Sequence, residues 1–406
     1  MRERTHRVLA GGVCLGLALT GLSGVAALTG PIVRAYAIPD TIVGSSPQPP
    51  VVRQAEPSHH LPPVQGLQVD SLRDVPSALI GPVAALSHAR GFTLVLGGDG
   101  RLWARGANHR GQLGIGTDVD ESEGFLPVPG QSYRSVAAGG AHVLAVDLKG
   151  DLWAWGDNTQ GQLGSGKPEL KQVHRPVSVA NDIVSIAAGE RHSLAVRRDG
   201  TLLAWGENRF GELGNGSRQP SYTPVAIGEG FREVAAGSGY SMAIDRQGRL
   251  WAWGRGEAGR LGNGQTRDQL TPVEVGEGFL HVVASRAQTF AIKLDGSLWA
   301  WGSNLLGQLG DGTRTDRLVP VHIGDGFAEV AAGGAHTLAL KRDGSVWAWG
   351  SNGFGQLADG GFADRLIPAQ VADGFHFIGV AGGASVMARR DGSVKMAGAR
   401  LVARDQ

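Results

Sequence analysis

Hydrophobic and polar positions alternate in short runs along most of the chain, and one stretch shows the pattern clearly. Val330–Gly333 is small and apolar, as the crowded innermost strand of a repeated unit must be, and Thr337–Leu340 forms a second apolar run. Asp343-Gly344 follows as a two-residue turn suited to a tight hairpin. Val346–Trp349 predicts a third strand, and the proline-containing run Leu366–Val371 predicts an edge strand, because an edge tolerates a missing N–H donor. The unit therefore comprises four short antiparallel strands.

The same pattern recurs along the chain, and one glycine in each copy fixes its register. The steps between successive register glycines are 50, 50, 48, 48, 48 and 48 residues. A period this regular is typical of stacked or radially arranged units. Seven copies predict an all-β fold, a seven-bladed β-propeller of four-stranded antiparallel blades over residues 63–406. The register glycines are Gly106, Gly156, Gly206, Gly254, Gly302, Gly350 and Gly398.

All ten tryptophans fall in the third strand of a repeat. Trp347 and Trp349 point to the same side of their strand, because side chains alternate with period two, while Val346 and Ala348 face the other way. Each blade thus has one bulky face and one slim face, which fills the interior of a circular stack. We expect the tryptophans to form the core rather than a ligand site.

The last copy is degenerate, with Lys395 and Ala397 at the tryptophan positions, and the chain ends before a fourth strand. The segment His60–Gly66 resembles Arg317–Ile323, which is a predicted fourth strand. We therefore expect the N-terminal segment of the propeller to complete the last blade, because closure removes exposed sheet edges.

The N-terminus has the pattern of a signal peptide. Arg2, Arg4 and Arg7 precede an apolar stretch from Val8 to about Leu28, and Ala35-Tyr36-Ala37 supplies small residues where a signal peptidase reads. Residues 1–37 are predicted to be cleaved, and the proline-rich residues 38–62 to form a linker. A retained membrane anchor is the alternative, since ~20 apolar residues can span a bilayer.

Composition agrees with an exported repeat protein. Glycine occupies 65 of 406 positions, as many tight turns require. The 38 basic side chains nearly balance the 37 acidic ones, which makes nucleic acid an unlikely partner. Cleavage would also remove Cys14, the only cysteine, so the mature protein would be held together without disulfides. We expect it to be secreted or held in the cell envelope.

The repeated string resembles the repeat of the regulator of chromosome condensation family. Its first half, A-A-G-G-x-H-x-L-A, is read at 137–145 and 331–339. Its second half resembles D-G-x-x-W-A-W-G-x-N-x-x-G-Q-L-G-x-G and is read from Gly150 to Gly166 and from Asp343 onward. The Gly-Gln-Leu-Gly element recurs at Gly111, Gly161 and Gly307, and in altered form at Gly211, Gly259 and Gly355. This resemblance covers about residues 63–406 and implies a seven-bladed propeller.

The resemblance transfers fold more readily than function. The eukaryotic namesake exchanges guanine nucleotide on a nuclear small GTPase through a β-wedge in one blade and holds chromatin partly through a basic tail. Blade spacing here varies by only two residues and leaves no room for a wedge, and the N-terminus is a signal sequence. Nucleotide exchange is therefore not expected.

One position per blade, eight residues before the turn glycine, is polar or aromatic in most copies. Such residues could line one mouth of the propeller as a binding ring, with a histidine as the base of a polysaccharide-cleaving enzyme. They could instead satisfy loop backbone groups. The residues are Phe92, His142, His192, Tyr240, Gln288, His336 and Ala384.

Metal binding is not indicated. The three histidines of this set fall in blades two, three and six and cannot converge on one ion. The acidic run 118–124 lacks the spacing and terminal glutamate of a calcium loop, so we expect a solvated loop. No nucleophile motif or phosphate loop is present, and no cofactor is predicted.

The variable loops suggest a binding module rather than an enzyme. Apolar residues occupy corresponding loop tips at Phe210, Leu305, Leu306 and Phe354, and exposed apolar tips are typical anchors for a partner. We expect a monomer that binds a protein, with a surface glycan as the alternative. Some secreted bacterial propellers with similar Trp-Gly repeats inhibit β-lactamases, so an enzyme inhibitor is a second hypothesis, although those blades are shorter.

Overall fold

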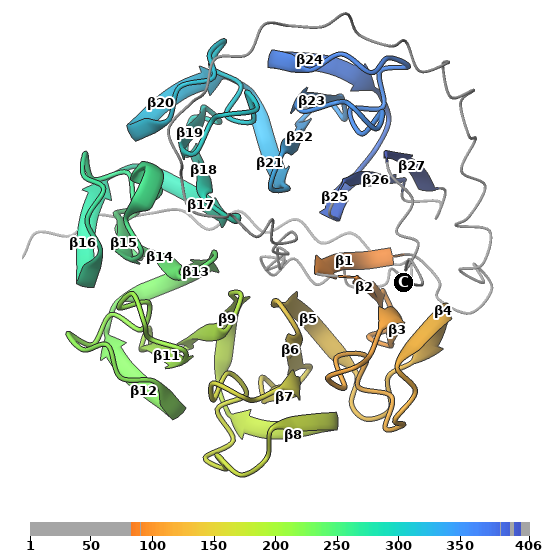
Figure 1. Ribbon diagram of the computed structural model, residues 1–406, viewed down its shortest axis with the longest axis vertical. Coiled ribbons are helices and arrows are strands. Elements are labelled where there is room, and N and C mark those ends of the chain that lie inside the picture. Colours follow the sequence, from red (N-terminus) through yellow and green to blue (C-terminus); the bar gives the residue numbers. More distant parts are fainter. Residues whose placement is uncertain (1–82, 90, 382, 390–393, 399–406) are drawn as a thin grey trace, which may run out of the picture. The chain divides into compact units, whose positions relative to one another are not determined.

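The structure is a computed structural model that describes residues 83–89, 91–381, 383–389 and 394–398. In these residues seven small antiparallel sheets are arranged radially around a central axis (Figure 1). Six sheets have four strands and the seventh has three among the described residues. Strand order within each sheet follows the chain. The predicted all-β, seven-bladed propeller is confirmed.

The blades are numbered along the chain, and each begins with its innermost strand. Blade 1 contains β1 (Val83–Ala89), β2 (Phe92–Gly97), β3 (Leu102–Ala107) and β4 (Glu121–Pro127). Blade 2 contains β5 (Tyr133–Ala138), β6 (His142–Asp147), β7 (Leu152–Asp157) and β8 (Gln172–Ala180). Blade 3 contains β9 (Ile183–Ala188), β10 (His192–Arg197), β11 (Leu202–Gly206) and β12 (Ser221–Gly228).

The remaining blades follow the same plan. Blade 4 contains β13 (Phe231–Ala236), β14 (Tyr240–Asp245), β15 (Leu250–Gly254), the short 3-10 helix η1 (Glu257–Gly259) and β16 (Gln269–Gly276). Blade 5 contains β17 (Phe279–Ala284), β18 (Gln288–Lys293), β19 (Leu298–Gly302) and β20 (Arg317–Gly324). Blade 6 contains β21 (Phe327–Ala332), β22 (His336–Lys341), β23 (Val346–Gly350) and β24 (Arg365–Ala372). Blade 7 contains β25 (Phe377–Ala381), β26 (Ala384–Ala388) and β27 (Val394–Gly398).

The core lies between blades, as the bulky and slim faces predict, but the two tryptophans of a strand differ in burial. Trp349 is fully buried, and its Nε1 donates to the main-chain oxygen of Gln308 in the preceding blade at 2.8 Å. Trp347 is only half-buried; it donates to the Ser345 hydroxyl at 3.0 Å, and the Lys341 ammonium lies 4.3 Å from its ring centre. The prediction that the tryptophans are buried in the core is therefore right for Trp349, but Trp347 is only partly covered.

The register glycines are required by the backbone. Gly350 pairs with His336 on the neighbouring strand and has a φ of +98°. A Cβ at this position would lie 2.6 Å from the main-chain oxygen of Ala335, closer than real atoms approach. A second glycine faces the next blade: a Cβ on Gly310 would lie 2.7 Å from Nε1 of Trp349. Glycine thus permits both the bend of the strand and the close contact between blades.

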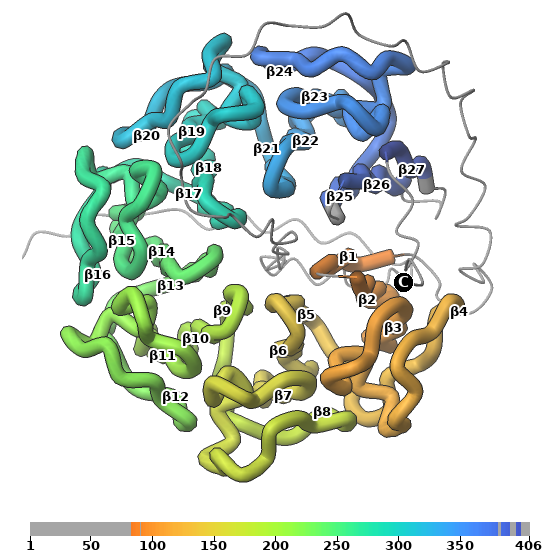
Figure 2. Tube along the Cα trace, in the orientation of Figure 1, coloured from red at the N-terminus to blue at the C-terminus, as the bar shows by residue number. Residues whose placement is uncertain are grey.

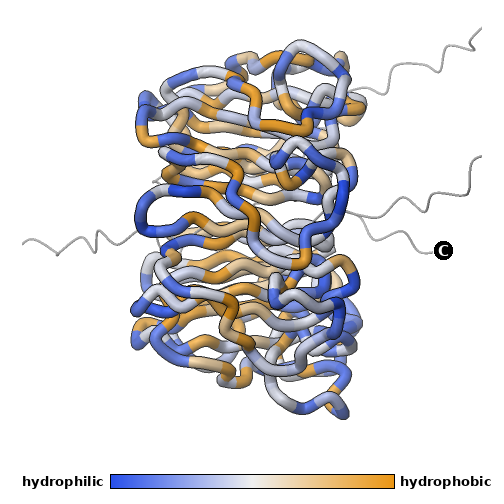
Figure 3. Tube along the Cα trace, turned by 90° about the vertical axis from the view of Figure 1, so that its left-hand side faces the viewer, coloured by the Kyte–Doolittle hydropathy of each residue, from blue (hydrophilic) through white to orange (hydrophobic). Residues whose placement is uncertain are grey.

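The strand connections separate into two faces. Connections from the first to the second strand and from the third to the fourth emerge at one end of the strands, and the hairpins from the second to the third strand emerge at the other. We call the first end the loop face; its long loops are residues 108–120, 158–171, 207–220, 255–268, 303–316 and 351–364. The opposite end is the hairpin face. Seen from the side, hydrophilic residues gather in loops at these two faces and apolar ones in the strands between (Figure 3).

The ring closes between blades 1 and 7. Strand β1 contacts β25, and a Cβ on Gly379 would meet the ring of His88 at 3.4 Å. The tube drawing shows blade 1 and blade 7 as neighbours (Figure 2). The proposed closing strand at 60–66, the signal segment 1–37 and the linker 38–62 lie outside the described residues. Within the described part of the chain, no helix has the length and apolarity needed to cross a membrane.

Candidate functional site on the loop face

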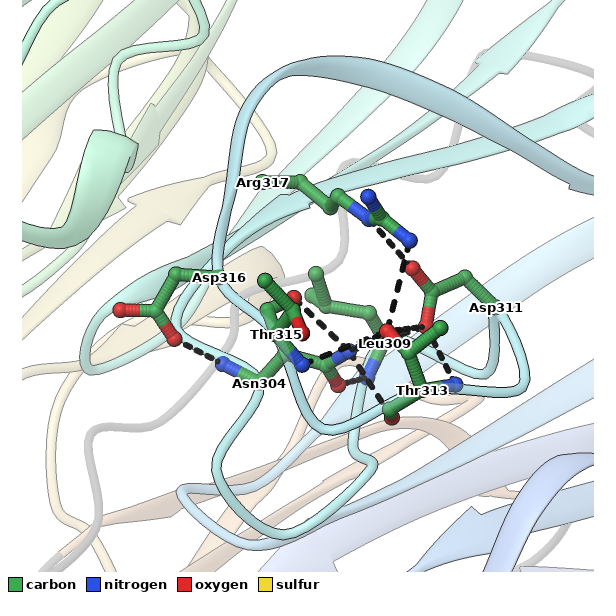
Figure 4. A network of polar contacts seen from close by, with 7 residues as sticks. All are labelled: Asn304, Leu309, Asp311, Thr313, Thr315, Asp316 and Arg317. Atoms are coloured by element: carbon green, nitrogen blue, oxygen red, sulfur yellow. Dashed lines mark hydrogen bonds and ion pairs between the residues drawn. The ribbon is translucent and has the colours of Figure 1, made fainter.

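A buried asparagine fastens each long loop of blades 1, 2, 3, 5 and 6. In blade 5, Asn304 accepts the N–H of Leu309 at 2.9 Å and donates to the Asp311 carboxylate at 2.9 Å and to main-chain oxygens of Thr313 and Thr315 (Figure 4). Its own N–H donates to Asp316 at 2.8 Å. One side chain therefore satisfies groups spread over the whole loop, so the loop is held in a single conformation.

The glutamine of the Gly-Gln-Leu-Gly element completes this arrangement. The side-chain oxygen of Gln308 accepts the N–H of Leu306 at 2.8 Å, and its main-chain oxygen accepts the Trp349 indole and the Thr337 hydroxyl, both at 2.8 Å. The loop tip in blade 5 is thus anchored both within its own blade and to the next one.

The predicted loop tips divide into two groups. Leu305 is 70% exposed and Phe354 67% exposed, and Leu306 is also exposed, as expected for contact residues. Phe362, which the sequence did not single out, is 62% exposed on the same loop as Phe354. Phe210 differs because it is half-buried beside two guanidinium groups, with Arg209 5.4 Å and Arg255 4.8 Å from its ring centre.

The three histidines do not line an open mouth. His142, His192 and His336 are buried, and the Nε2 of His192 lies 2.9 Å from the Ser241 hydroxyl of the next blade. Ser241 in turn donates to the main-chain oxygen of Glu212 at 2.7 Å. His142 and His336 make the equivalent contacts with a serine of the following blade. The expectation of a histidine binding ring is therefore corrected: these residues join blades.

Burial also sets their protonation. It lowers the pKa of His192 to about 3, because a charged imidazole in this site would lose its hydration. The pKa of His142 falls to about 3 and that of His336 to about 4, again mainly through burial. Neutral, enclosed imidazoles that already bond across a blade interface are poor candidates for the base of a polysaccharide-cleaving reaction.

A polar pocket of about 270 Å³ opens on the loop face. Its walls come from blades 3, 4 and 5, and its most abundant residue is arginine. We call it the arginine pocket. It is lined by Glu190, Arg191, Glu207, Arg209, Phe210, Ser238, Gly239, Arg255, Arg260 and Arg286.

Arg260 is the buried member of this set. Its Nε donates to the main-chain oxygen of Glu257 at 2.8 Å, and its Nη1 donates to those of Ser238 and Arg286 at 3.2 Å each. Its Nη2 lies 3.3 Å from the exposed Glu257 carboxylate. Burial lowers the pKa of Arg260, so the site places a desolvated positive charge beside the pocket.

The carboxylates of the pocket only partly balance its charge. Glu207 lies 4.0 Å from Arg191, and Glu190 accepts the hydroxyl hydrogen of Ser238. Burial raises the pKa of Glu207, although nearby Arg191 opposes this shift. Two carboxylates among the lining residues face five guanidinium groups. The Glu257 carboxylate, which pairs with Arg255 and Arg260, adds a third negative charge, so the pocket keeps an excess of positive charge.

No expectation from the sequence pointed to the arginine pocket, although the sequence contains a signal for it. Arg260 stands where blades 1, 2, 5 and 6 have the glutamine of Gly-Gln-Leu-Gly, and Gly256 stands where five blades have the loop-fastening asparagine. Arg260 still bonds its own loop through the main-chain oxygen of Glu257, but it brings a charge that the consensus glutamine lacks. Two such departures in one loop mark blade 4 as specialised.

The acidic run 118–124 is a surface feature, as expected. The side chains of Asp118 and Asp120 are exposed, and each lies 3.4 Å from a histidine, His174 and His109 respectively. In the part of the chain that the structure describes, no three or more histidine, cysteine, aspartate or glutamate side chains gather in a way that could hold a metal ion.

Seven radial sheets, each built from one repeat of 48 to 50 residues, define this chain as a repeat β-propeller. The family description "RCC1-like domain" matches residues 54–325, more than half of the chain. The regulator of chromosome condensation (RCC1) repeat matches residues 327–356 and, in a second description, 343–388. The chain belongs to the RCC1-like domain family.

Solved structures agree with this fold. Human WBSCR16 is 21% identical with a TM-score of 0.66, covering 78% of this chain and 86% of its own. Prp20p from Saccharomyces cerevisiae, described with its binding properties toward Gsp1p and histones, is 22% identical with a TM-score of 0.64, covering 76% of this chain and 80% of its own. At these identities the likeness establishes the fold alone. No curated protein matches the sequence.

Proposed function

We propose that this propeller is an exported, non-enzymatic module that binds a protein partner through its loop face. The observation that carries the proposal is the exposure of Leu305, Phe354 and Phe362 at the tips of loops in blades 5 and 6. These apolar side chains project from otherwise hydrophilic loops. Export rests on the basic and apolar pattern of residues 1–37.

Rigid presentation makes these tips suitable anchors. Asn304 fastens the loop that carries Leu305, and Asn352 fastens the loop that carries Phe354 and Phe362, accepting the N–H of Leu357 at 3.0 Å. A prefixed loop loses little conformational entropy on binding. Burying one such side chain contributes about 1.5 to 3 kcal/mol, so three together can supply the centre of a stable interface.

Structural neighbours support a protein partner. Prp20p is described with binding to Gsp1p and histones, and another structure shows yeast RCC1 (Prp20) with Kap60 bound. We transfer from them only the use of this scaffold for binding protein. The identity of the partner must come from chemistry on this chain.

The proposal is tested by chemical cross-linking of the purified full chain to envelope and culture-fluid proteins of the producing organism, with partners identified by mass spectrometry. The test variant carries Leu305→Asp and Phe354→Asp. The control carries Leu148→Asp and Leu294→Asp, which are equally exposed leucines on the hairpin face. We expect a stoichiometric partner that the test variant loses and the control retains. Retention by the test variant, or retention of the wild type on glycan material alone, would refute the proposal.

A further inference from the structure

We propose that the arginine pocket binds the carboxylates of an acidic peptide segment in the protein partner. The inference rests on the proposed function and names the chemistry of that partner. It is carried by the gathering of five guanidinium groups from four separate loops into one pocket of about 270 Å³.

The arginines are not part of the repeat. The position of Arg286 is Gly140 in blade 2 and Gly334 in blade 6, and the position of Arg191 is Ala141 and Ala335 in those blades. None of these other residues is charged. The periodic packing of the propeller is therefore achieved elsewhere without a charge at either position.

The same holds for the arginines of the long loops. Arg255 replaces a serine found in blades 5 and 6, and Arg260 replaces their glutamine. In those blades the glutamine side chain ties down the loop tip, as Gln308 does with Leu306. In blade 4 a cation takes the place of this neutral anchor: Arg260 still ties its loop through Glu257, and its charge falls beside the other arginines rather than elsewhere on the ring.

Electrostatics favours an anionic ligand in this pocket. Arginines brought together repel one another. Burying the Arg260 charge costs solvation, which three main-chain oxygens and a Glu257 carboxylate shared with Arg255 offset only in part. An incoming carboxylate would reduce the excess positive charge of the pocket as a whole. The planar guanidinium fork also matches the two oxygens of a carboxylate.

The walls favour acidic side chains of a peptide over a highly charged polyanion. Glu190 and Glu207 lie within the pocket and limit its excess positive charge, so it suits a few singly charged carboxylates better than a chain of doubly charged phosphates. Phe210, which lies beside Arg209 and Arg255, offers an apolar surface to the methylene groups of a glutamate. The pocket opens on the loop face that also carries Leu305 and Phe354, so an acidic segment with neighbouring apolar residues can engage both.

The test uses the full chain and a fluorescein-labelled hexaglutamate peptide, with binding followed by fluorescence anisotropy at low and at physiological salt. The pocket variant carries Arg255→Ala and Arg286→Ala. The control variant carries Arg246→Ala and Arg342→Ala, which removes the same charge from exposed turns of the hairpin face. A third variant, Arg209→Ala, removes an exposed pocket side chain, so we expect it to leave the fold intact. Far-UV circular dichroism checks the folding of each.

We expect the wild type to bind hexaglutamate and not hexalysine, the pocket variant to bind at least 10-fold more weakly, and Arg209→Ala to weaken binding about 3-fold or more. The control should change affinity less than 2-fold. Equal losses in pocket and control variants, or no binding by the wild type, would overturn the inference. So would displacement of hexaglutamate by inorganic phosphate at equal concentration, which would identify a general anion site instead.

The two proposals fail separately. The Leu305→Asp and Phe354→Asp variant should lose the cross-linked partner while keeping its affinity for hexaglutamate within about 3-fold. If the wild type captures a partner through the tips but does not bind hexaglutamate, the proposed protein-binding function stands and the proposal of an acidic ligand is wrong.

Discussion

The contact between Gly310 of blade 5 and Trp349 of blade 6 offers the sharpest test of how the blades fit together. Gly310 has a φ of +81°, and a Cβ added there would lie 2.7 Å from the indole nitrogen. Blade 6 has Ala358 at the corresponding place, with a φ of +60°. The next blade has Ala397 where the tryptophan would be, so no ring limits the space beside Ala358.

Gly310→Ala should therefore destabilise the propeller through two effects. A left-handed alanine costs about 1 to 2 kcal/mol. Trp349 must also shift. The shift weakens its 2.8 Å hydrogen bond to Gln308, which costs about 1 kcal/mol, and forces the neighbouring side chains to repack, which costs about 1 to 3 kcal/mol. We expect a loss of about 3 to 6 kcal/mol in the free energy of unfolding.

Urea unfolding followed by tryptophan fluorescence measures this effect directly. Ala358→Gly is the matched control: it relieves the strain of a positive φ without involving a tryptophan, and should leave the unfolding midpoint unchanged or raise it. A Gly310→Ala protein that unfolds at the wild-type midpoint would show that the glycine is not needed for the contact. A loss of stability in Ala358→Gly would show that strain at this position is not the cause.

Three further predictions address pH, loop order and the tips. Burial lowers the pKa of His192 to about 3, below the 6.5 of a free imidazole. Between these values the unfolded chain binds more protons than the folded one, so stability is lost as the pH falls below about 6.5. His192→Gln should flatten that decline, which is measured as the free energy of unfolding from pH 7.5 to 4. Asn304→Ala leaves the Leu309 N–H without its acceptor, so we expect the free energy of unfolding to fall by about 1 to 3 kcal/mol and proteolysis within residues 303–316 to become faster. An unchanged rate of cleavage would contradict the role of the asparagine. Phe354→Asp should change unfolding free energy by no more than about 0.5 kcal/mol, because the ring is exposed, and a larger loss in a thermal melt would mean that it packs against the fold.

Much of the loop face could be anticipated from local sequence. The tips Leu305 and Phe354 were expected to be exposed and are, because each sits at the end of a short turn whose conformation is set by its own glycines and asparagine. Phe210 occupies the corresponding tip but is half-buried. The difference comes from Arg255 of the next blade, which covers its ring and lies 45 residues further along the chain.

The histidines illustrate the same limit. Their position at the start of the second strand was evident from the repeat, and satisfaction of backbone groups was one expectation for them. The actual partner of His192 is a serine hydroxyl 49 residues away on the next blade, which then bonds a main-chain oxygen. No local pattern specifies this partner, because it depends on how two blades are stacked.

The sequence by itself determined the strands, their order and the number of blades, because side-chain alternation and turn glycines act over a few residues and the repeat multiplies them seven times. Only the tertiary structure decided which tryptophan of a pair is fully buried and which side chains meet across blades. The arginine pocket belongs to this second class: Arg191 and Arg286 are separated by 95 residues. They come together only because three successive blades present their inner turns at the same end of the ring.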